Sequence, residues 1–197
     1  MTSLEFMLVA GLSYLLGSVP FGLVITKLAG LGDIREIGSG NIGATNVLRT
    51  GRKDLALATL LLDAGKGAVA VLVTRYFVSA DLAAIAGTAA FIGHCFPVYL
   101  RFNGGKGVAT FLGTIVAVDP VLGITALGAW VIAALLFRIS SLAALIASAA
   151  APLFAYYFIS GDSWMAMAFM TAVIFFRHKD NIGRIAAGTE PRIGKKA

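Results

Sequence analysis

The chain has 197 residues, of which 58% are hydrophobic and only 13% are charged, and its mean hydropathy is +0.88. This composition excludes an ordinary water-soluble domain, in which about a quarter of the residues are charged. In so apolar a chain the net charge of +6 reports membrane topology first, and we expect no nucleic-acid partner. One cysteine, Cys95, and two histidines supply neither an internal disulfide nor a usual zinc ligand set, so no metal and no cofactor are expected.

Seven apolar segments are predicted, in a single integral-membrane domain covering residues 1–197. Four are uninterrupted and close to the roughly 20 residues that cross a bilayer, namely 6–26, 82–100, 121–137 and 139–161. A fifth, 55–74, contains only Asp63 and Lys66 as charged residues. The segments 108–118 and 163–176 are too short to cross comfortably alone, and we expect short or partly re-entrant helices there. The predicted fold is all-α and polytopic, with about seven transmembrane helices.

The basic residues between these segments fall almost entirely on one side of the membrane. That side holds Lys27, Arg35, Arg49, Arg52, Lys53, Arg101, Lys106, Arg138 and the six basic residues of 177–196, whereas the other side holds Arg75 alone. Because positively charged loops stay in the cytoplasm, the N-terminus is predicted outside and the C-terminus inside.

The first polar cytoplasmic segment, residues 37–52, combines glycines, amides, hydroxyl groups and arginines. Small residues let backbone N–H groups approach an anion, and Arg49 can bind a phosphate with two parallel hydrogen bonds. A solvated loop between two spans is the alternative. We favour a phosphate site because glycines, asparagines and hydroxyl residues are concentrated in 38–46.

The second polar segment, residues 93–110, contains Gly104, Gly105, Lys106 and Gly107 directly before the short apolar segment 108–118. Free N–H groups at a helix start and an ammonium group favour a bound anion. A tight turn with a lysine that only sets topology is the alternative.

The third polar segment begins at residue 177. In a helix, His178, Asn181 and either Arg184 or Ile185 would share one face. A basic helix flanking the membrane explains the segment equally well. Within the fifth span, Asp63 and Lys66 lie one helical turn apart, so they form either a self-neutralising structural pair or a pair that places Lys66 beside the site.

Taken together, these segments are similar to the bacterial acyl-phosphate:glycerol-3-phosphate acyltransferase family. The resemblance rests on Gly-Ser-Gly-Asn-Ile-Gly-Ala-Thr-Asn-Val-Leu-Arg from Gly38, on Gly-His-Cys-Phe-Pro-Val-Tyr-Leu-Arg-Phe-Asn-Gly-Gly-Lys-Gly-Val-Ala-Thr from Gly93, and on Arg-His-Lys-Asp-Asn-Ile-Gly-Arg from Arg177. It extends from the first helix to about Glu190.

The resemblance implies a seven-helix enzyme of the bacterial inner membrane with its active site facing the cytoplasm. Such an enzyme moves a fatty acyl chain from acyl phosphate to the 1-hydroxyl of sn-glycerol 3-phosphate and releases lysophosphatidic acid and phosphate, the first acylation of phospholipid synthesis. It uses no cofactor, acts among membrane lipids, and is functionally coupled to the enzyme that makes acyl phosphate.

The resemblance also implies roles for individual residues. Catalytic roles fall on Ser39, Asn41, Thr45, Arg49, Lys106, His178 and Asn181. Substrate phosphate binding falls on Ser39, Arg49, Gly104, Gly105, Lys106 and Gly107, with His94 and Glu190 as structural residues near the site. From its charge and position, we add Lys66 to the phosphate-binding residues.

The chemistry of this reaction fits the residue types. An acyl phosphate is already activated, so the protein mainly aligns two anions and stabilises the leaving phosphate. We expect His178 to be a positioning hydrogen-bond partner, because the donor phosphate can itself accept the proton; a general-base role is the alternative. The competing functions are an anion transporter, for which no inverted repeat is found, and a purely structural membrane subunit.

Overall fold

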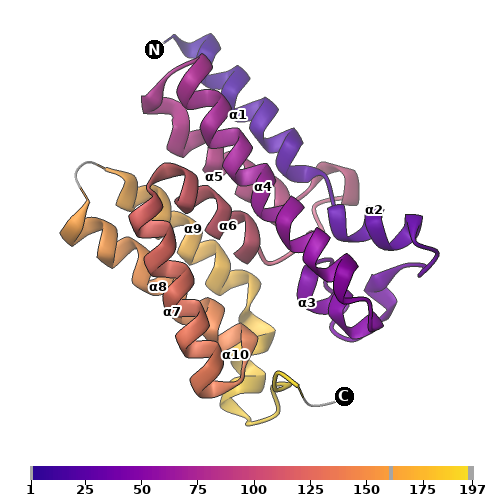
Figure 1. Ribbon diagram of the computed structural model, residues 1–197. Coiled ribbons are helices and arrows are strands. Elements are labelled where there is room, and N and C mark those ends of the chain that lie inside the picture. Colours follow the sequence, from indigo (N-terminus) through magenta and orange to yellow (C-terminus); the bar gives the residue numbers. More distant parts are fainter. Residues whose placement is uncertain (1, 160–161, 195–197) are drawn as a thin grey trace. The chain divides into compact units, whose positions relative to one another are not determined.

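The structure is a computed structural model that describes residues 2–159 and 162–194, and within these ranges it contains helices and no strand (Figure 1). The chain divides into two compact units, Met1–Val118 and Asp119–Ala197, here called unit 1 and unit 2.

Unit 1 is built around three long helices and the loops that join them. Its α-helices are α1 (Ser3–Ser18), α2 (Phe21–Leu28), α3 (Ala44–Val47), α4 (Lys53–Phe77), α5 (Ala83–Cys95) and α6 (Val108–Val118), with 3-10 turns η1 (Ile34–Glu36), η2 (Leu48–Thr50), η3 (Ala80–Leu82) and η4 (Val98–Leu100). Helix α5 lies against α1, α4 and α6, and α4 also contacts α2 and α3. Helix α4 therefore connects the two loop regions that carry the first and second polar segments.

Unit 2 consists of α7 (Pro120–Phe137), α8 (Ser140–Phe158), α9 (Ser163–Arg177) and α10 (Lys179–Ala186). Helix α8 packs against both α7 and α9, and α10 contacts both α8 and α9. The side chain of Asp119 accepts a hydrogen bond from Leu122 N, and Pro120 occupies the first turn, so α7 begins with a side-chain cap and a residue suited to that position. Arg138, in the left-handed region at φ +56°, separates α7 from α8.

The all-helical, polytopic prediction is confirmed. In the described part of the chain, five helical segments are long and apolar enough to cross a membrane, namely 3–28, 53–77, 80–100, 120–137 and 140–158, and α6 and α9 are shorter apolar helices, as expected. The first segment differs from the uninterrupted span predicted over 6–26, because the helix breaks into α1 and α2 at Val19 and Pro20. Proline lacks an N–H and cannot continue the hydrogen-bond ladder.

The helices of unit 1 approach each other closely where glycines face a neighbouring backbone. A Cβ on Gly17 would overlap Ala90 of α5, and one on Gly113 would overlap the carbonyl of Ala64 of α4. Such contacts are typical of membrane helices, where small residues let backbones come together. These contacts hold α1 closely against α5, and α6 closely against α4.

Candidate active site

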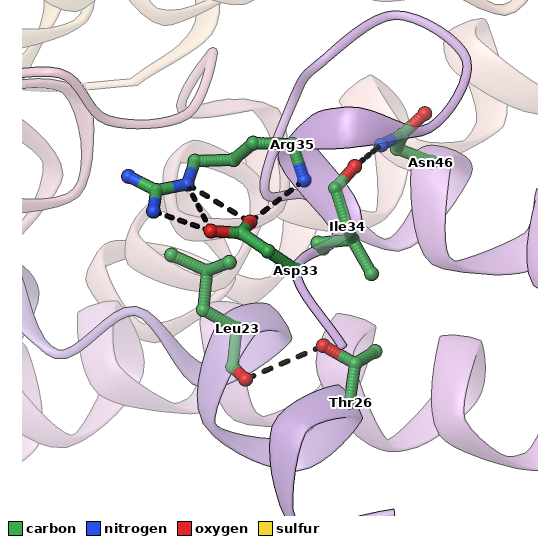
Figure 2. A network of polar contacts seen from close by, with 6 residues as sticks. All are labelled: Leu23, Thr26, Asp33, Ile34, Arg35 and Asn46. Carbon is green, nitrogen blue, oxygen red and sulfur yellow. Dashed lines mark hydrogen bonds and ion pairs between the residues drawn. The ribbon is translucent and has the colours of Figure 1, made fainter. Parts of the chain in front are cut away.

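The first polar segment forms a loop between α2 and α4 that is organised by Asn46. This side chain is 2% exposed, and its Nδ2 donates to the carbonyl of Ile34 at 2.7 Å (Figure 2). Its Oδ1 accepts from the backbone N–H of Ser39 at 3.1 Å and lies 3.4 Å from Ser39 Oγ. Because the amide is bonded at both ends, it fixes the backbone around Ser39.

Ser39 and Arg49 come together at Gly38. Gly38 has φ +58°, and a Cβ built there would lie 2.6 Å from Arg49 Cδ and 2.7 Å from Asn46 Oδ1. The Arg49 side chain therefore lies directly over the glycine backbone, and both Ser39 and Arg49 are exposed. A hydroxyl group, a guanidinium group and a side-chain-free backbone at one place form a suitable phosphate contact.

The other two predicted residues of this segment lie next to these. Asn41 Oδ1 accepts from Gly43 N at 2.9 Å, just before α3 begins, and Thr45 is exposed on α3. The structure thus brings Ser39, Asn41, Thr45 and Arg49 into one loop.

The charges around this loop are not equivalent. Arg35 Nε donates to both carboxylate oxygens of Asp33 at 2.9 and 3.0 Å (Figure 2), and these hydrogen bonds lower the pKa of Asp33 to about 2. Arg35 is therefore neutralised locally. Among the described residues no ion pair involves Arg49, so its charge remains available to an anion.

The second polar segment folds against the C-terminal end of α5. Gly105 N donates to the carbonyl of His94 at 3.0 Å, and a Cβ on Gly105 would overlap the His94 imidazole. A Cβ on Gly104 would overlap the same carbonyl, and Gly107, at φ +83°, lies against the ring of Phe91. The glycines of this loop are thus required by close contact, and half-buried Lys106 lies between two of them.

Asp63 and Lys66 face each other as their spacing predicts, at 3.0 Å between Oδ1 and Nζ, and both are buried. Lys66 Nζ also donates to the carbonyl of Val19 at 3.0 Å, at the break between α1 and α2. His94 Nδ1 is 3.5 Å from Asp63 Oδ1. Two of the three N–H donors of Lys66 are therefore directed to a carboxylate and a carbonyl, which leaves one for a further acceptor such as a phosphate.

The two loops of unit 1 attach to successive turns of α4. Gly22 of α2 lies between the carbonyl of Ile42, in the first loop, and the Thr59 side chain. Asp63, one turn after Thr59, faces His94 beneath the second loop. The first and second predicted segments are thus held next to the same stretch of one helix.

The third polar segment lies in unit 2 and is organised by Glu190. The Glu190 carboxylate accepts from Ser141 Oγ at 2.6 Å, from Asn181 Nδ2, and from Arg184 Nε at 2.7 Å. Burial raises the pKa of Glu190, but the three hydrogen bonds outweigh it, so its pKa lies below the ordinary value. Asn181 and Arg184 share a helix face, as predicted.

His178 lies at the junction of α9 and α10 and is 2% exposed. Its Nδ1 is 2.8 Å from the carbonyl of Ile174, which can only accept, so Nδ1 carries a proton. Nε2 is then the ring nitrogen that can accept a hydrogen bond when the imidazole is neutral.

Two residues that organise these loops were not among the predicted site residues. Asn46 lies inside the first segment, but its spacing to Ile34 and Ser39 gives no sign that it is the buried centre of the loop. Ser141 lies 49 residues from Glu190 in an apolar helix, so no local pattern indicates their contact.

The chain has relatives of high sequence identity among named proteins. A family model described as glycerol-3-phosphate acyltransferase matches residues 7–188. A glycerol-3-phosphate acyltransferase of Dinoroseobacter shibae is 59% identical over 184 residues, covering 93% of this chain and 91% of the relative. One of Paramagnetospirillum magneticum is 61% identical with the same coverage.

Solved structures agree. The crystal structure of PlsY, an integral membrane glycerol 3-phosphate acyltransferase, in its glycerol 3-phosphate form superimposes with a TM-score of 0.89 at 36% identity, covering 96% of each chain. Its lysophosphatidic acid form gives a TM-score of 0.88 at 36% identity, over 96% of this chain and 95% of that one. With a family match over most of its length and relatives well above half identical, this chain belongs to the glycerol-3-phosphate acyltransferase family.

Proposed function

We propose that this membrane enzyme acylates sn-glycerol 3-phosphate at its 1-hydroxyl, uses acyl phosphate as the donor, and releases lysophosphatidic acid and phosphate. The acylation of glycerol 3-phosphate is supported by the family match and by the glycerol 3-phosphate and lysophosphatidic acid forms of PlsY. The acyl-phosphate donor is supported by the glycines and cationic side chains of the polar loops, which suit the binding of phosphate groups. The single observation that carries the proposal furthest is the placement of Arg49 over Gly38 beside Ser39.

In the proposed reaction the protein mainly aligns the two substrates, because acyl phosphate is already activated. The acceptor hydroxyl oxygen attacks the acyl carbonyl carbon, the bond from that carbon to the phosphate oxygen breaks, and the electron pair leaves with phosphate. Arg49 and Lys106 stabilise negative charge that grows on the leaving phosphate. Two anionic substrates must lie close together, and two cationic side chains on adjacent loops reduce their repulsion.

The hydroxyl proton needs no dedicated protein base in this proposal. The donor phosphate can accept it, and it then leaves as hydrogen phosphate. His178, held through Nδ1 by the carbonyl of Ile174, orients a substrate oxygen or a neighbouring side chain through Nε2. Asn181 is held by Glu190 and acts in the same segment.

Ser39, Asn41, Thr45 and the Gly104–Gly107 loop complete the proposed substrate contacts. Lys66 is a further proposed phosphate contact, through the N–H donor that Asp63 and Val19 do not use. No residue is assigned to a cofactor. The family match crosses the boundary at Val118, which supports one functional domain over residues 1–197.

The proposed setting is the bacterial inner membrane, with the N-terminus outside and the polar loops in the cytoplasm. The distribution of basic residues supports this orientation. A cytoplasmic site would receive acyl phosphate from the enzyme that makes it, and the acyl chain would remain among membrane lipids.

The assignment of Arg49 is tested by a neighbouring pair of variants in purified protein. Arg49→Gln should reduce formation of lysophosphatidic acid from palmitoyl phosphate and glycerol 3-phosphate by on the order of a hundredfold, because a charge that aligns anions is lost. Arg52→Gln, three residues away and paired with Asp54, is the matched control and should stay close to the wild-type rate. Equal rates in the two variants would contradict the assigned site.

A further inference from the structure

Asp63, Lys66 and His94 are buried ionisable side chains that lie close together in unit 1. Asp63 and Lys66 are each 3% exposed and His94 is 4% exposed. Ionisable groups within a membrane protein are costly unless they are paired, and their retention calls for a specific reason.

Lys66 connects these three side chains to the break between α1 and α2. Lys66 Nζ is 3.0 Å from Asp63 Oδ1 and donates to Val19 O at 3.0 Å. Lys66 thus ties α4 to the break between α1 and α2, and this anchoring also restricts the position of the Asp63 carboxylate.

The second contact is with the end of α5. His94 Nδ1 is 3.5 Å from the same oxygen, Asp63 Oδ1. The other side of the imidazole faces the glycine loop, because a Cβ on Gly105 would overlap Nε2. The His94 carbonyl accepts from Gly105 N at 3.0 Å. The Gly104–Gly107 loop, which includes Lys106, therefore lies against the imidazole ring.

We propose that Asp63 is a positioning residue that acts through His94: it sets the orientation of the imidazole and thereby the place of the Gly104–Gly107 loop and Lys106. This inference rests on the proposed function, since it assigns the loop to one of the two anionic substrates. Asp63 touches no substrate in this account. A rotated imidazole would move into the space left by Gly105, and an anion-binding loop displaced by about an ångström can lose on the order of a hundredfold in rate.

A merely structural ion pair would behave differently. It would stabilise the fold by satisfying two buried charges, and its removal would lower stability without selecting one substrate. The positioning role predicts a change in the KM for one anionic substrate, and it predicts that this change depends on His94.

The test is a double-mutant cycle that never leaves one member of the ion pair alone. Its four proteins are wild type, Asp63→Asn with Lys66→Met, His94→Gln, and the triple variant. For each protein the KM for glycerol 3-phosphate, the KM for palmitoyl phosphate, kcat and the thermal unfolding midpoint in detergent are measured.

We expect Asp63→Asn with Lys66→Met to raise the KM for one of the two substrates on the order of tenfold, with a smaller change in kcat. His94→Gln should raise the KM for the same substrate, and the triple variant should be no worse than His94→Gln, because residues acting through one another are not additive. Effects that multiply, or an unchanged KM with a lower unfolding midpoint, would overturn the proposal.

Two further variants keep the test decisive. If the neutral pair does not fold, Asp63→Glu preserves the ion pair but displaces the carboxylate, and it should change the KM in wild type and not beside His94→Gln. The exposed pair Arg52 and Asp54, at the start of the same helix, is the matched control, and Arg52→Gln with Asp54→Asn should leave both KM values unchanged. A wild-type protein without acyl transfer would refute the proposed function itself, whereas wild-type turnover with an additive cycle would refute only the positioning role.

Discussion

Asn46 is the residue on which the first polar loop depends most directly. Its amide donates to the Ile34 carbonyl (Figure 2). The same amide accepts from the backbone N–H of Ser39, and it is almost completely buried. An asparagine in this position determines where the serine and the backbone around Gly38 lie.

Asn46→Ala should therefore lower kcat/KM for glycerol 3-phosphate acylation by on the order of tenfold to a hundredfold. It should also cost about 1–3 kcal/mol of stability, because a buried carbonyl loses its donor. Steady-state rates and thermal unfolding in detergent check both effects. Thr125→Ala, which removes an exposed hydroxyl bonded within its own helix, is the control. Full activity in Asn46→Ala would contradict the role of Asn46.

His178 is predicted to orient rather than to remove the proton. His178→Ala should leave a small measurable rate, and its dependence on pH should keep the wild-type shape, because the donor phosphate accepts the proton. The pH–rate profile of kcat/KM in both proteins is the measurement. Complete loss of activity would instead favour His178 as the base.

Predictability differs sharply among these residues. Ser39, Arg49 and Lys106 can be proposed as site residues from sequence, because glycine-rich polar segments are unusual in an apolar chain and match a family. The phosphate role of Lys66 stays a prediction; the spacing of Asp63 and Lys66 indicates their pairing but not the additional contact of Lys66 with the carbonyl of Val19. Such contacts join residues far apart in the chain, and a local pattern cannot contain them.

The contact between α4 and α6 shows how the elements fix the site. Gly67 of α4 faces α6 so closely that a Cβ would lie 2.5 Å from Thr114 Oγ1 and 2.6 Å from the Thr110 carbonyl. Helix α6 begins directly after the Gly104–Gly107 loop, so its distance from α4 determines where this loop ends.

Gly67→Ala should lower the unfolding free energy by about 1–3 kcal/mol, because the added methyl group overfills the contact. Gly65→Ala, two residues earlier in the same helix with open space around the new Cβ, should be neutral or stabilising by about 0.5–1 kcal/mol. Thermal or denaturant unfolding of the two variants in the same detergent tests this. Similar destabilisation in both would mean that the close contact is not the cause.

Glu190 connects α8 to α10, the last helix of the described chain, because its carboxylate accepts from Ser141 of α8 and from Arg184 of α10. Because its pKa is lower in the folded protein than the ordinary value of 4.5, its contribution is fully present above that value and is lost as pH falls from it through the lower pKa of the folded protein. Wild type should therefore exceed Glu190→Gln in unfolding midpoint at pH 7, and this difference should shrink below about pH 4.5. Glu36→Gln, at an exposed position, is the control. A difference that stays constant with pH would show that the charge of Glu190 is not involved.

The helical structure of all seven apolar segments was predictable, but the residues at which the helices begin and end were less so. Long apolar runs favour helices, and all seven predicted segments contain one. The break at Pro20 was missed because an apolar run gives no signal other than the proline itself, and prolines occur within membrane helices. Pro152 lies inside α8 without ending it, which illustrates the ambiguity.

At the scale of the whole molecule, the apolar composition alone indicates that the chain lies in a membrane. A chain with so few charges exposes many large apolar side chains, among them Ile124, Leu135 and Tyr157 in unit 2, each more than 60% exposed. In a bilayer these faces contact lipid, and the polar loops are the places where water-soluble and apolar substrates can meet. The three motifs predicted the family because they occur together and in order; the fold by itself would not have indicated the reaction.

The central claim is acyl transfer from acyl phosphate to glycerol 3-phosphate. It is tested most directly by phosphate release from palmitoyl phosphate by the purified protein, with and without glycerol 3-phosphate, and with palmitoyl-CoA as the comparison donor. We predict release that requires glycerol 3-phosphate, equals the lysophosphatidic acid formed, and has no counterpart with the thioester. Folded protein that turns over neither donor, or that uses palmitoyl-CoA equally well, would contradict it.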